Sequence, residues 1–204
     1  MLNLTRADWQ FCFRWALVTA IAVSIPLLLH QVSFPRMVAI WTVPIWIGIA
    51  QGLTLERYWT RSIPWGFTTA MGGVGAFAVA AILRQLVDSI NVLADLRGTI
   101  FVSLPAIVGV LWGLAQALVL RGTSRWWRWW PGVNVVILHI SIVGLVILTV
   151  HDGVQQYYAS VPPRPWWHWL FYVFLSGLIS GFLESLALAL FLKQTPRLQA
   201  EPKQ

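Results

Sequence analysis

The chain has 204 residues, of which 58% are hydrophobic and 10% are charged, and its net charge is +7. Soluble domains carry about 25% charged residues, so this composition excludes a water-soluble protein. Nucleic-acid binding does not explain the net charge, because the basic residues are concentrated in alternate loops between apolar segments, as membrane topology requires.

Six apolar segments are long enough to form transmembrane helices, which need roughly 20 residues each. Ten Arg and Lys residues fall on one side of this topology and four on the other, so both termini are expected to be cytoplasmic. We expect a single transmembrane domain, residues 1–192, and a disordered cytoplasmic tail, residues 193–204. The six expected spans are approximately 11–30, 37–55, 63–83, 99–120, 131–150 and 168–192.

The first predicted hairpin, residues 11–57, has Gln51 as the polar residue of its second span. Pro44 and Gly48 lie seven and three residues before this glutamine. Small residues at such positions let helix backbones approach closely, and neighbouring helices can satisfy the carbonyl that a proline leaves free. The segment therefore combines a close-packing motif with one buried amide.

The second predicted hairpin, residues 63–121, repeats this pattern with Gly109 and Gly113 before Gln116. Between its two spans, residues 83–97 place leucine and isoleucine at helical spacing, with charged residues on the opposite face. This pattern predicts an amphipathic helix on the outer membrane surface.

The third predicted hairpin, residues 130–192, places Gly177 and Gly181 before Glu184 and is expected to have an irregular outer loop at 151–167. The three polar positions are separated by 65 and then 68 residues, and a period of this size indicates a repeated supersecondary unit. We therefore predict an all-α membrane protein whose six transmembrane helices form three helical-hairpin repeats in a pseudo-threefold arrangement.

The first helix of each hairpin carries a polar residue four positions after a tryptophan. Antiparallel helices place these residues at the depth of the Gln and Glu residues, so we expect one polar layer with a pair from each hairpin. Buried amides often serve only as interhelical hydrogen bonds, whereas an acidic residue inside a span is a candidate functional site. Arg14 is the expected partner of Glu184. The expected pairs are Thr19 with Gln51, Thr69 with Gln116, and Asn134 with Glu184.

Tryptophan occurs 14 times and clusters at the ends of the predicted spans, which is typical of an interfacial aromatic belt. Trp15, Trp65 and Trp130 are among the residues expected in this belt. His139 is the only histidine well inside a predicted span. It is interpreted as a packing residue, as a ligand to a metal, or as a ligand to a bound cofactor, for which chlorophyll, carotenoid and haem are the candidates.

Catalytic and metal-binding motifs do not occur in a credible context: the chain has a single cysteine and no dense metal-ligand spacing, P-loop or zinc-protease motif. Neither a metal site nor enzymatic activity is therefore expected. The segments G-I-A-Q-G-L-T-L-E-R at 48–57 and G-L-A-Q-A-L-V-L-R at 113–121, joined by a helix that starts at Trp65, resemble a loose group of bacterial membrane proteins. These proteins, common in cyanobacteria and Chloroflexi, repeat a G-x-x-Q-x-x-x-L-R hairpin segment. The resemblance implies this architecture and a bacterial inner or thylakoid membrane.

Three functions follow as hypotheses. The first is a non-enzymatic accessory subunit that contacts membrane lipids and other membrane protein subunits and binds a hydrophobic partner within a larger complex. The second is a small transporter or substrate-binding membrane component that uses the polar layer around Glu184. The third is a pigment- or haem-binding protein in which His139 is the ligand, with Gln51, Gln116 or Glu184 as further axial ligands.

Overall fold

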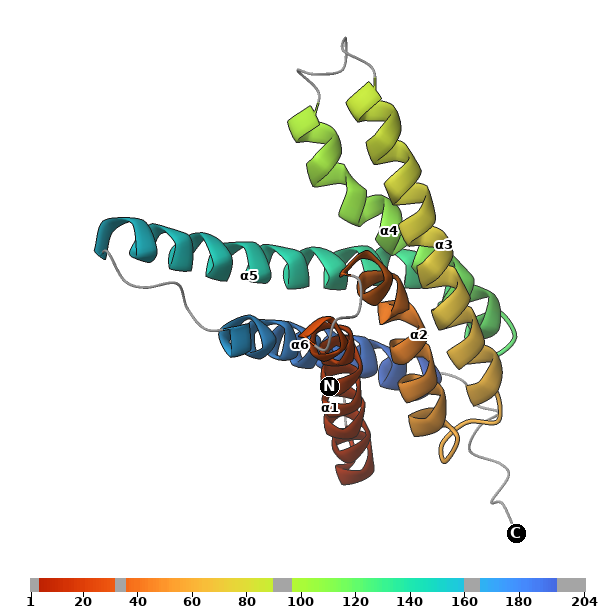
Figure 1. The fold of residues 1–204 in the computed structure, drawn as a ribbon. Coiled ribbons are helices and arrows are strands. Elements are labelled where there is room, and N and C mark those ends of the chain that lie inside the picture. Colours follow the sequence, from red (N-terminus) through yellow and green to blue (C-terminus); the bar gives the residue numbers. More distant parts are fainter. Residues whose placement is uncertain (1–3, 32–35, 90–96, 160–165, 194–204) are drawn as a thin grey trace.

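The computed structural model describes residues 4–31, 36–89, 97–159 and 166–193, and the regular structure of these ranges is helical (Figure 1). A short 3-10 helix, η2 (Trp127–Trp129), precedes the fifth long helix. The six long helices are α1 (Arg6–Gln31), α2 (Arg36–Leu55), α3 (Ser62–Ser89), α4 (Arg97–Leu120), α5 (Trp130–Ala159) and α6 (Trp166–Lys193).

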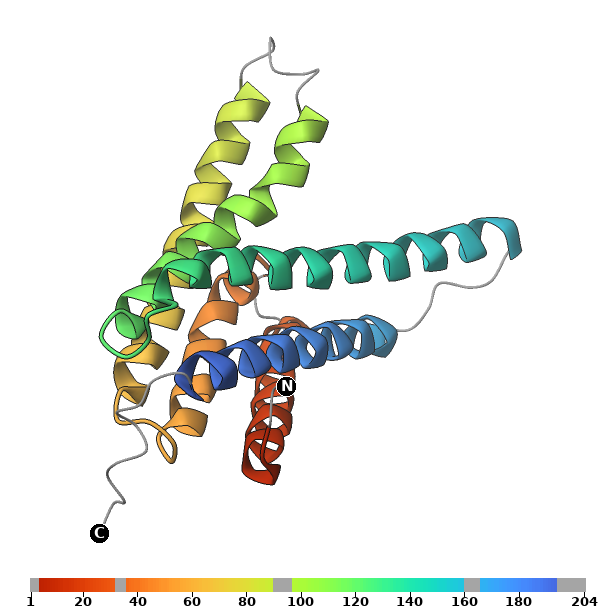
Figure 2. The same ribbon diagram turned by 180° about the vertical axis from the view of Figure 1, so that it is seen from behind.

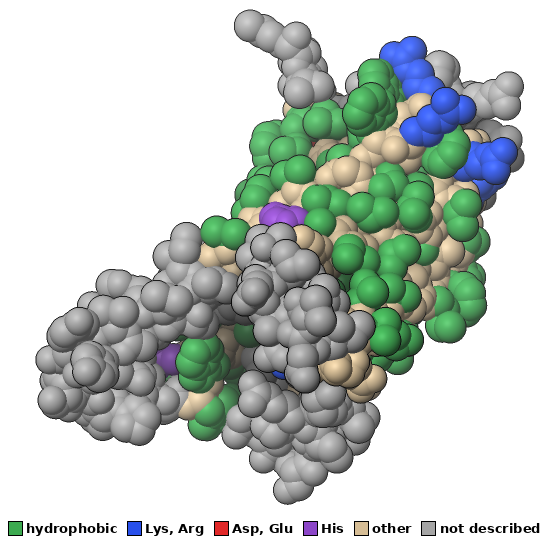
Figure 3. Space-filling model, turned by 90° about the horizontal axis from the view of Figure 1, so that it is seen from above, with side chains coloured by type: hydrophobic (Ala, Val, Ile, Leu, Met, Phe, Trp, Pro, Cys, Tyr) green, Lys and Arg blue, Asp and Glu red, His purple; other side chains and the backbone are tan. Residues whose placement is uncertain are grey.

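Four segments within the described residues are long and apolar enough to cross a membrane, and α2 adds a shorter apolar segment, Trp41–Leu55. Large apolar side chains such as Ile63, Phe67 and Leu118 are exposed on the flanks of the bundle. Figure 3 shows hydrophobic side chains covering much of the flank, with Lys and Arg gathered at one end. These features define a membrane-associated, tryptophan-rich helical bundle. The four long segments are Arg6–Pro26, Ser62–Ser89, Ser103–Leu120 and Trp166–Leu192.

The start of α1 is fixed by a reciprocal cap. The Thr5 backbone N–H donates to Asp8 Oδ2 over 2.6 Å, and the Asp8 backbone N–H donates to Thr5 Oγ1 over 3.3 Å. Such a pair satisfies backbone N–H groups that have no partner inside the helix. The α1 helix therefore begins at a position that its sequence defines locally.

The helices pack in cyclic order, α1 to α2 and onward to α6, and α6 returns to pack extensively against α1. The turn between α2 and α3 and the segment between α4 and α5 lie at the same end of the bundle. They carry Arg57, Arg61, Arg121, Arg125 and Arg128, and we call this the basic end. In both ribbon views the α3–α4 pair diverges from the α5–α6 pair away from this end (Figures 1 and 2).

Among the described residues, the largest fully buried side chains are three leucines and three tryptophans of the core at the basic end. Each leucine lies four residues after one of the predicted polar positions, and all six side chains are fully buried, with an exposed fraction of 0%. The placement of these tryptophans in an interfacial belt was therefore wrong, since their rings fill the centre of the bundle. The six residues are Leu55, Leu120, Leu188, Trp15, Trp65 and Trp130.

Two helices, α3 and α5, continue through segments for which a different structure was expected. Residues 83–89 continue α3 to Ser89, so this part of the predicted surface helix is not separate, and residues 90–96 lie outside the described residues. Residues 151–159, expected in an irregular loop, continue α5 to Ala159. In each case the segment contains no proline and has a pattern that a longer helix also satisfies. The rest of the predicted loop up to 165 and the tail from 194 lie outside the described residues.

Candidate functional site

The carboxyl group of Glu184 is the meeting point of three N–H donors from three different helices. Trp15 Nε1 on α1 donates to Oε2 over 3.2 Å, and Gln51 Nε2 on α2 donates to the same oxygen over 2.6 Å. Gln116 Nε2 on α4 donates to Oε1 over 3.3 Å. Glu184 itself has an exposed fraction of 8%, so these donors take the place of water around a buried acidic group.

The orientation of the two glutamine amides follows from two further tryptophans. Trp65 Nε1 donates to Gln51 Oε1 over 3.2 Å, and Trp130 Nε1 donates to Gln116 Oε1 over 2.8 Å. An indole nitrogen can only donate, so it must face the oxygen of each amide. The amide NH₂ groups therefore turn toward Glu184, and the network runs from tryptophan through glutamine to the carboxyl group.

The predicted polar pairs are present only in part. Gln116 Nε2 donates to Thr69 Oγ1 over 3.0 Å, as expected for the second hairpin. Asn134 Nδ2 instead donates to the Trp130 carbonyl within its own helix. The buried Thr19 hydroxyl has no hydrogen-bond partner.

Arg14 does not pair with Glu184 as expected. It is exposed at the basic end, where its Nη1 donates to the Tyr58 hydroxyl over 3.4 Å. The contacts of Glu184 come instead from neutral N–H donors in the interior.

Glycines let neighbouring hairpins approach closely around this network. A Cβ atom at Gly113 would lie 2.6 Å from Pro131 Cα, and one at Gly181 would lie 2.8 Å from Thr19 Cβ. The remaining small residues of the motif also pack on the first helix of an adjacent hairpin. The contacts are Pro44 with Gly73, Gly48 with Gly66, Gly109 with Val135, and Gly177 with Ala20. The motif therefore packs between hairpins, and the polar side chain three residues later is brought into the interior.

A cavity of about 770 Å³ begins at the polar network and extends away from the basic end. Gln51, Glu184, Thr19 and Asn134 line its polar end, and most of the remaining wall is aliphatic or aromatic. Its size lies within the range of roughly 300–1,000 Å³ that is usual for small-molecule sites. On the other side of the network, the buried leucines and tryptophans fill the bundle.

Two buried polar atoms on residues that line this cavity have no hydrogen-bond partner. They are Thr19 Oγ1, which can donate and accept, and Trp112 Nε1, which can only donate. Most buried polar groups in folded proteins are hydrogen-bonded, so these two atoms have hydrogen-bonding capacity that the described residues leave unused. The Trp112 ring packs edge-on against Phe77, whose ring centroid is 6.0 Å away.

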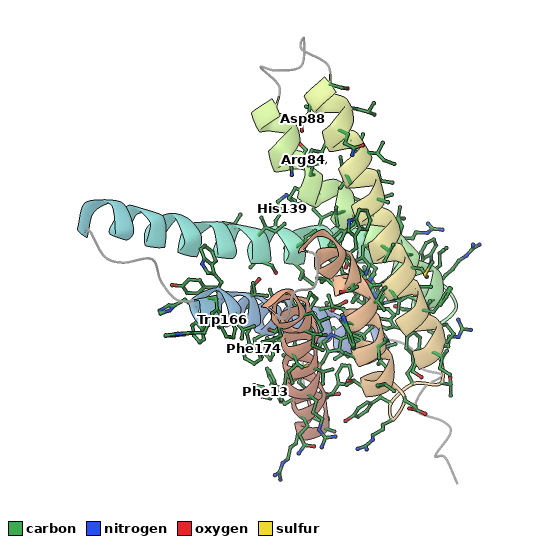
Figure 4. All side chains as sticks on the ribbon, in the orientation of Figure 1. Phe13, Arg84, Asp88, His139, Trp166 and Phe174 are labelled. Carbon is green, nitrogen blue, oxygen red and sulfur yellow. The ribbon has the colours of Figure 1, made fainter. Side chains whose placement is uncertain are left out.

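His139 also lines the cavity, from the middle part of α5 (Figure 4). Its Nδ1 lies 2.8 Å from the Val135 carbonyl oxygen. A carbonyl can only accept, so Nδ1 donates in this contact, and Nε2 is the ring nitrogen that remains for a ligand. Among the residues that the structure describes, no three His, Cys, Asp or Glu side chains are grouped as metal ligands.

The indole donors are the part of the site that the sequence interpretation missed. The signal was a spacing: Trp65 follows Gln51 by 14 residues, and Trp130 follows Gln116 by the same 14. This interval joins the end of one hairpin to the start of the next. The equivalent contact between α1 and α6 joins Trp15 to Glu184, which lie near opposite ends of the chain, so no short sequence interval predicts it.

Comparison of the chain with protein-family models, with curated proteins and with solved structures gives no match.

Proposed function

We propose that this protein is a non-enzymatic integral membrane protein that binds an uncharged, mostly apolar small molecule in its central cavity. The observation that carries the proposal is the pairing of an apolar cavity wall with two buried, unpartnered polar atoms, Thr19 Oγ1 and Trp112 Nε1. An indole N–H requires an acceptor, so the ligand carries a carbonyl or hydroxyl oxygen. On the side of the Glu184 network that faces the basic end, buried leucines and tryptophans pack together.

The proposal combines two of the expected functions. A bound apolar ligand suits an accessory subunit of a larger membrane complex, and it equally suits a substrate-binding component of a transporter. In both cases the Glu184 network holds the polar end of the cavity in one shape, because its three donors come from α1, α2 and α4.

We also propose that six spans form three hairpin repeats around a pseudo-threefold axis, with both termini cytoplasmic. Support comes from contacts that recur at equivalent positions. Each of the three fully buried tryptophans donates to the polar residue of the preceding hairpin, and the ring closes from Trp15 to Glu184. Each of the three buried leucines follows its polar residue by four positions.

The test is native mass spectrometry of the full chain, extracted gently from its own membrane, compared for two tryptophan substitutions on α5. Ile142 lines the cavity, whereas Ile140, two residues away, is exposed on the flank. We expect a bound small molecule in the wild type and in Ile140→Trp, and its loss in Ile142→Trp. A bare wild-type chain, or a ligand retained by Ile142→Trp, contradicts the proposal.

Pigment or haem binding is a second candidate, favoured by the position of His139 in the cavity wall, where Nδ1 contacts the Val135 carbonyl and Nε2 remains for a ligand. The same preparation distinguishes this candidate from binding of a colourless molecule. A visible absorption band that disappears in His139→Ala, while a Thr19→Val variant keeps it, assigns the ligand to the histidine. Absence of any visible absorption in the ligand-bound wild type excludes this candidate.

A further inference from the structure

A second concave site lies on the outside of the bundle, in a groove between α1 and α2. Its volume is about 460 Å³, and it shares no lining residue with the central cavity. The small side chains of Ala22 and Ala50 lie between larger neighbours on the two helices. Ile21, Ile49 and Leu53 line it and are about half or more exposed, so the groove opens to the apolar flank.

One end of the groove is basic. Arg14 on α1 and Arg57 just after α2 both line it, together with the Tyr58 hydroxyl, to which Arg14 donates. Neither guanidinium has a carboxylate partner among the residues that the structure describes. The neighbouring Glu56 is exposed and does not line the groove. Two guanidinium groups without a carboxylate, beside a hydroxyl, form a suitable contact for a phosphate.

The groove has the length of one membrane leaflet. From Arg14 to Ile25 on α1 the separation is 11 residues, or about 16 Å along a helix, and Trp46 on α2 is likewise 11 residues before Arg57, which lies just after α2. Half of a hydrocarbon core of about 30 Å is close to this length. A molecule with its charge at the arginines would therefore reach the middle of the bilayer along the apolar wall.

We propose that the α1–α2 groove binds one anionic phospholipid, whose phosphate contacts Arg14, Arg57 and Tyr58 and whose acyl chain lies between the two helices. A lipid fits this groove for three reasons. The two arginines complement a phosphate, the apolar wall has the length of one leaflet, and the groove is open to the membrane at the flank. The proposal does not depend on the ligand proposed for the central cavity, since the two sites share no residue.

The first hairpin alone has this basic pair. The residue before the buried tryptophan is Arg14 in the first hairpin, but Pro64 and Trp129 in the others. The residue six positions after the polar residue is Arg57 in the first, but Gly122 and Leu190 in the others. We therefore expect one selective lipid site per chain.

The experiment is native mass spectrometry of the full-length protein titrated with phosphatidylglycerol or phosphatidylcholine of identical acyl chains. We expect one phosphatidylglycerol to bind about tenfold more tightly than phosphatidylcholine. Arginine contributes about 1 kcal/mol each to anionic-lipid attraction, so Arg14→Gln with Arg57→Gln lowers phosphatidylglycerol affinity roughly 10- to 30-fold. The matched control, Arg125→Gln with Arg128→Gln, removes the same charge from the basic end outside the groove and changes the affinity less than about twofold.

A second variant tests the groove without altering its charge. Ala50→Phe fills the space between the helices and should weaken both lipids while leaving the two arginines in place. The proposal is overturned if the wild type does not distinguish the two lipids, if both double variants lose phosphatidylglycerol equally, or if Ala50→Phe binds both lipids as the wild type does.

Discussion

Glu184 differs from the residues at the two related positions, and the hydrogen bonds explain the difference. Gln51 and Gln116 each use their oxygen to accept from an indole, which leaves their NH₂ groups facing the interior. A third glutamine would present another NH₂ group to these donors. A carboxyl group presents two acceptor oxygens, and both are used.

Replacing Glu184 by glutamine should therefore destabilise the fold. The oxygen of the introduced amide can accept from Trp15 and Gln51, but the NH₂ group of that amide then faces the NH₂ group of Gln116. An unsatisfied buried donor costs about 1–3 kcal/mol, and we expect the free energy of unfolding to fall by this amount. Denaturant unfolding of the purified protein in detergent measures it. Unchanged stability in Glu184→Gln would show that the donors do not depend on the carboxyl group.

Moving the acid to position 116 offers a sharper comparison. In the double variant Glu184→Gln with Gln116→Glu, the new NH₂ group at position 184 faces a carboxyl oxygen at position 116, while Trp130 still has an acceptor. We expect this variant to recover most of the stability that Glu184→Gln loses, as a double-mutant cycle would reveal. Gln116→Glu alone places two carboxyl groups together and should be less stable than the double variant.

Sequence reasoning located the polar residues of this network but not their connections. Depth follows from the helical rise, so the spacing from the basic loops brought Gln51, Gln116 and Glu184 to one level. The direction in which each side chain points around its helix depends on which helix packs beside it. That choice is made by tertiary contacts such as those of Gly181 with Thr19, which leave this threonine unpaired.

At the scale of the helix, glycines divide into those that contact a neighbouring backbone and those that do not. A Cβ atom at Gly113 would lie 2.6 Å from Pro131 Cα, whereas one at Gly75 on α3 would have no atom within 4 Å. Both residues lie inside helices. The pair separates the effect of close approach from the intrinsic helix propensity of glycine.

We expect Gly113→Ala to lower the free energy of unfolding by about 1–3 kcal/mol, because α4 and α5 must move apart. Gly75→Ala should be neutral or stabilising by up to about 1 kcal/mol, since alanine is the better helix former. Thermal unfolding of the two variants in the same detergent provides the comparison. Equal melting temperatures would argue against close packing at Gly113.

The end of a helix was predictable only where a polar segment interrupts the apolar run of the sequence. The turn after Leu55 was correctly placed, because a basic, polar segment interrupts the apolar run. Beyond Leu83, however, the pattern of leucines and charges fits a helix on a membrane surface and also the continuation of α3. Sequence periodicity indicates that a segment is helical, but it does not indicate whether the helix lies on the membrane surface or continues out of the membrane.

At the scale of the whole molecule, the proposed six-span topology can be tested with single cysteines. Cys12 is the single cysteine of the sequence, and it is buried. A Cys12→Ser background therefore contains no native thiol. A cysteine at Thr60 in the α2–α3 turn should react with a membrane-impermeant reagent only in inside-out vesicles. One at Val161, between α5 and α6, should react only in intact cells. Labelling of both positions from the same side contradicts this topology.

Two amide NH₂ groups converge on one carboxyl group, and this arrangement cannot be built from three identical hairpins on separate chains. A trimer of identical hairpins bearing glutamine would bring three NH₂ groups together without a carboxyl acceptor. A trimer of identical hairpins bearing glutamate would crowd three carboxyl groups. Only unequal copies satisfy the interior, and joining them in one polypeptide fixes which copy carries the acid. One copy must therefore carry the acid and the other two must carry amides, and the acid can move to another copy only if glutamine replaces it at its present position.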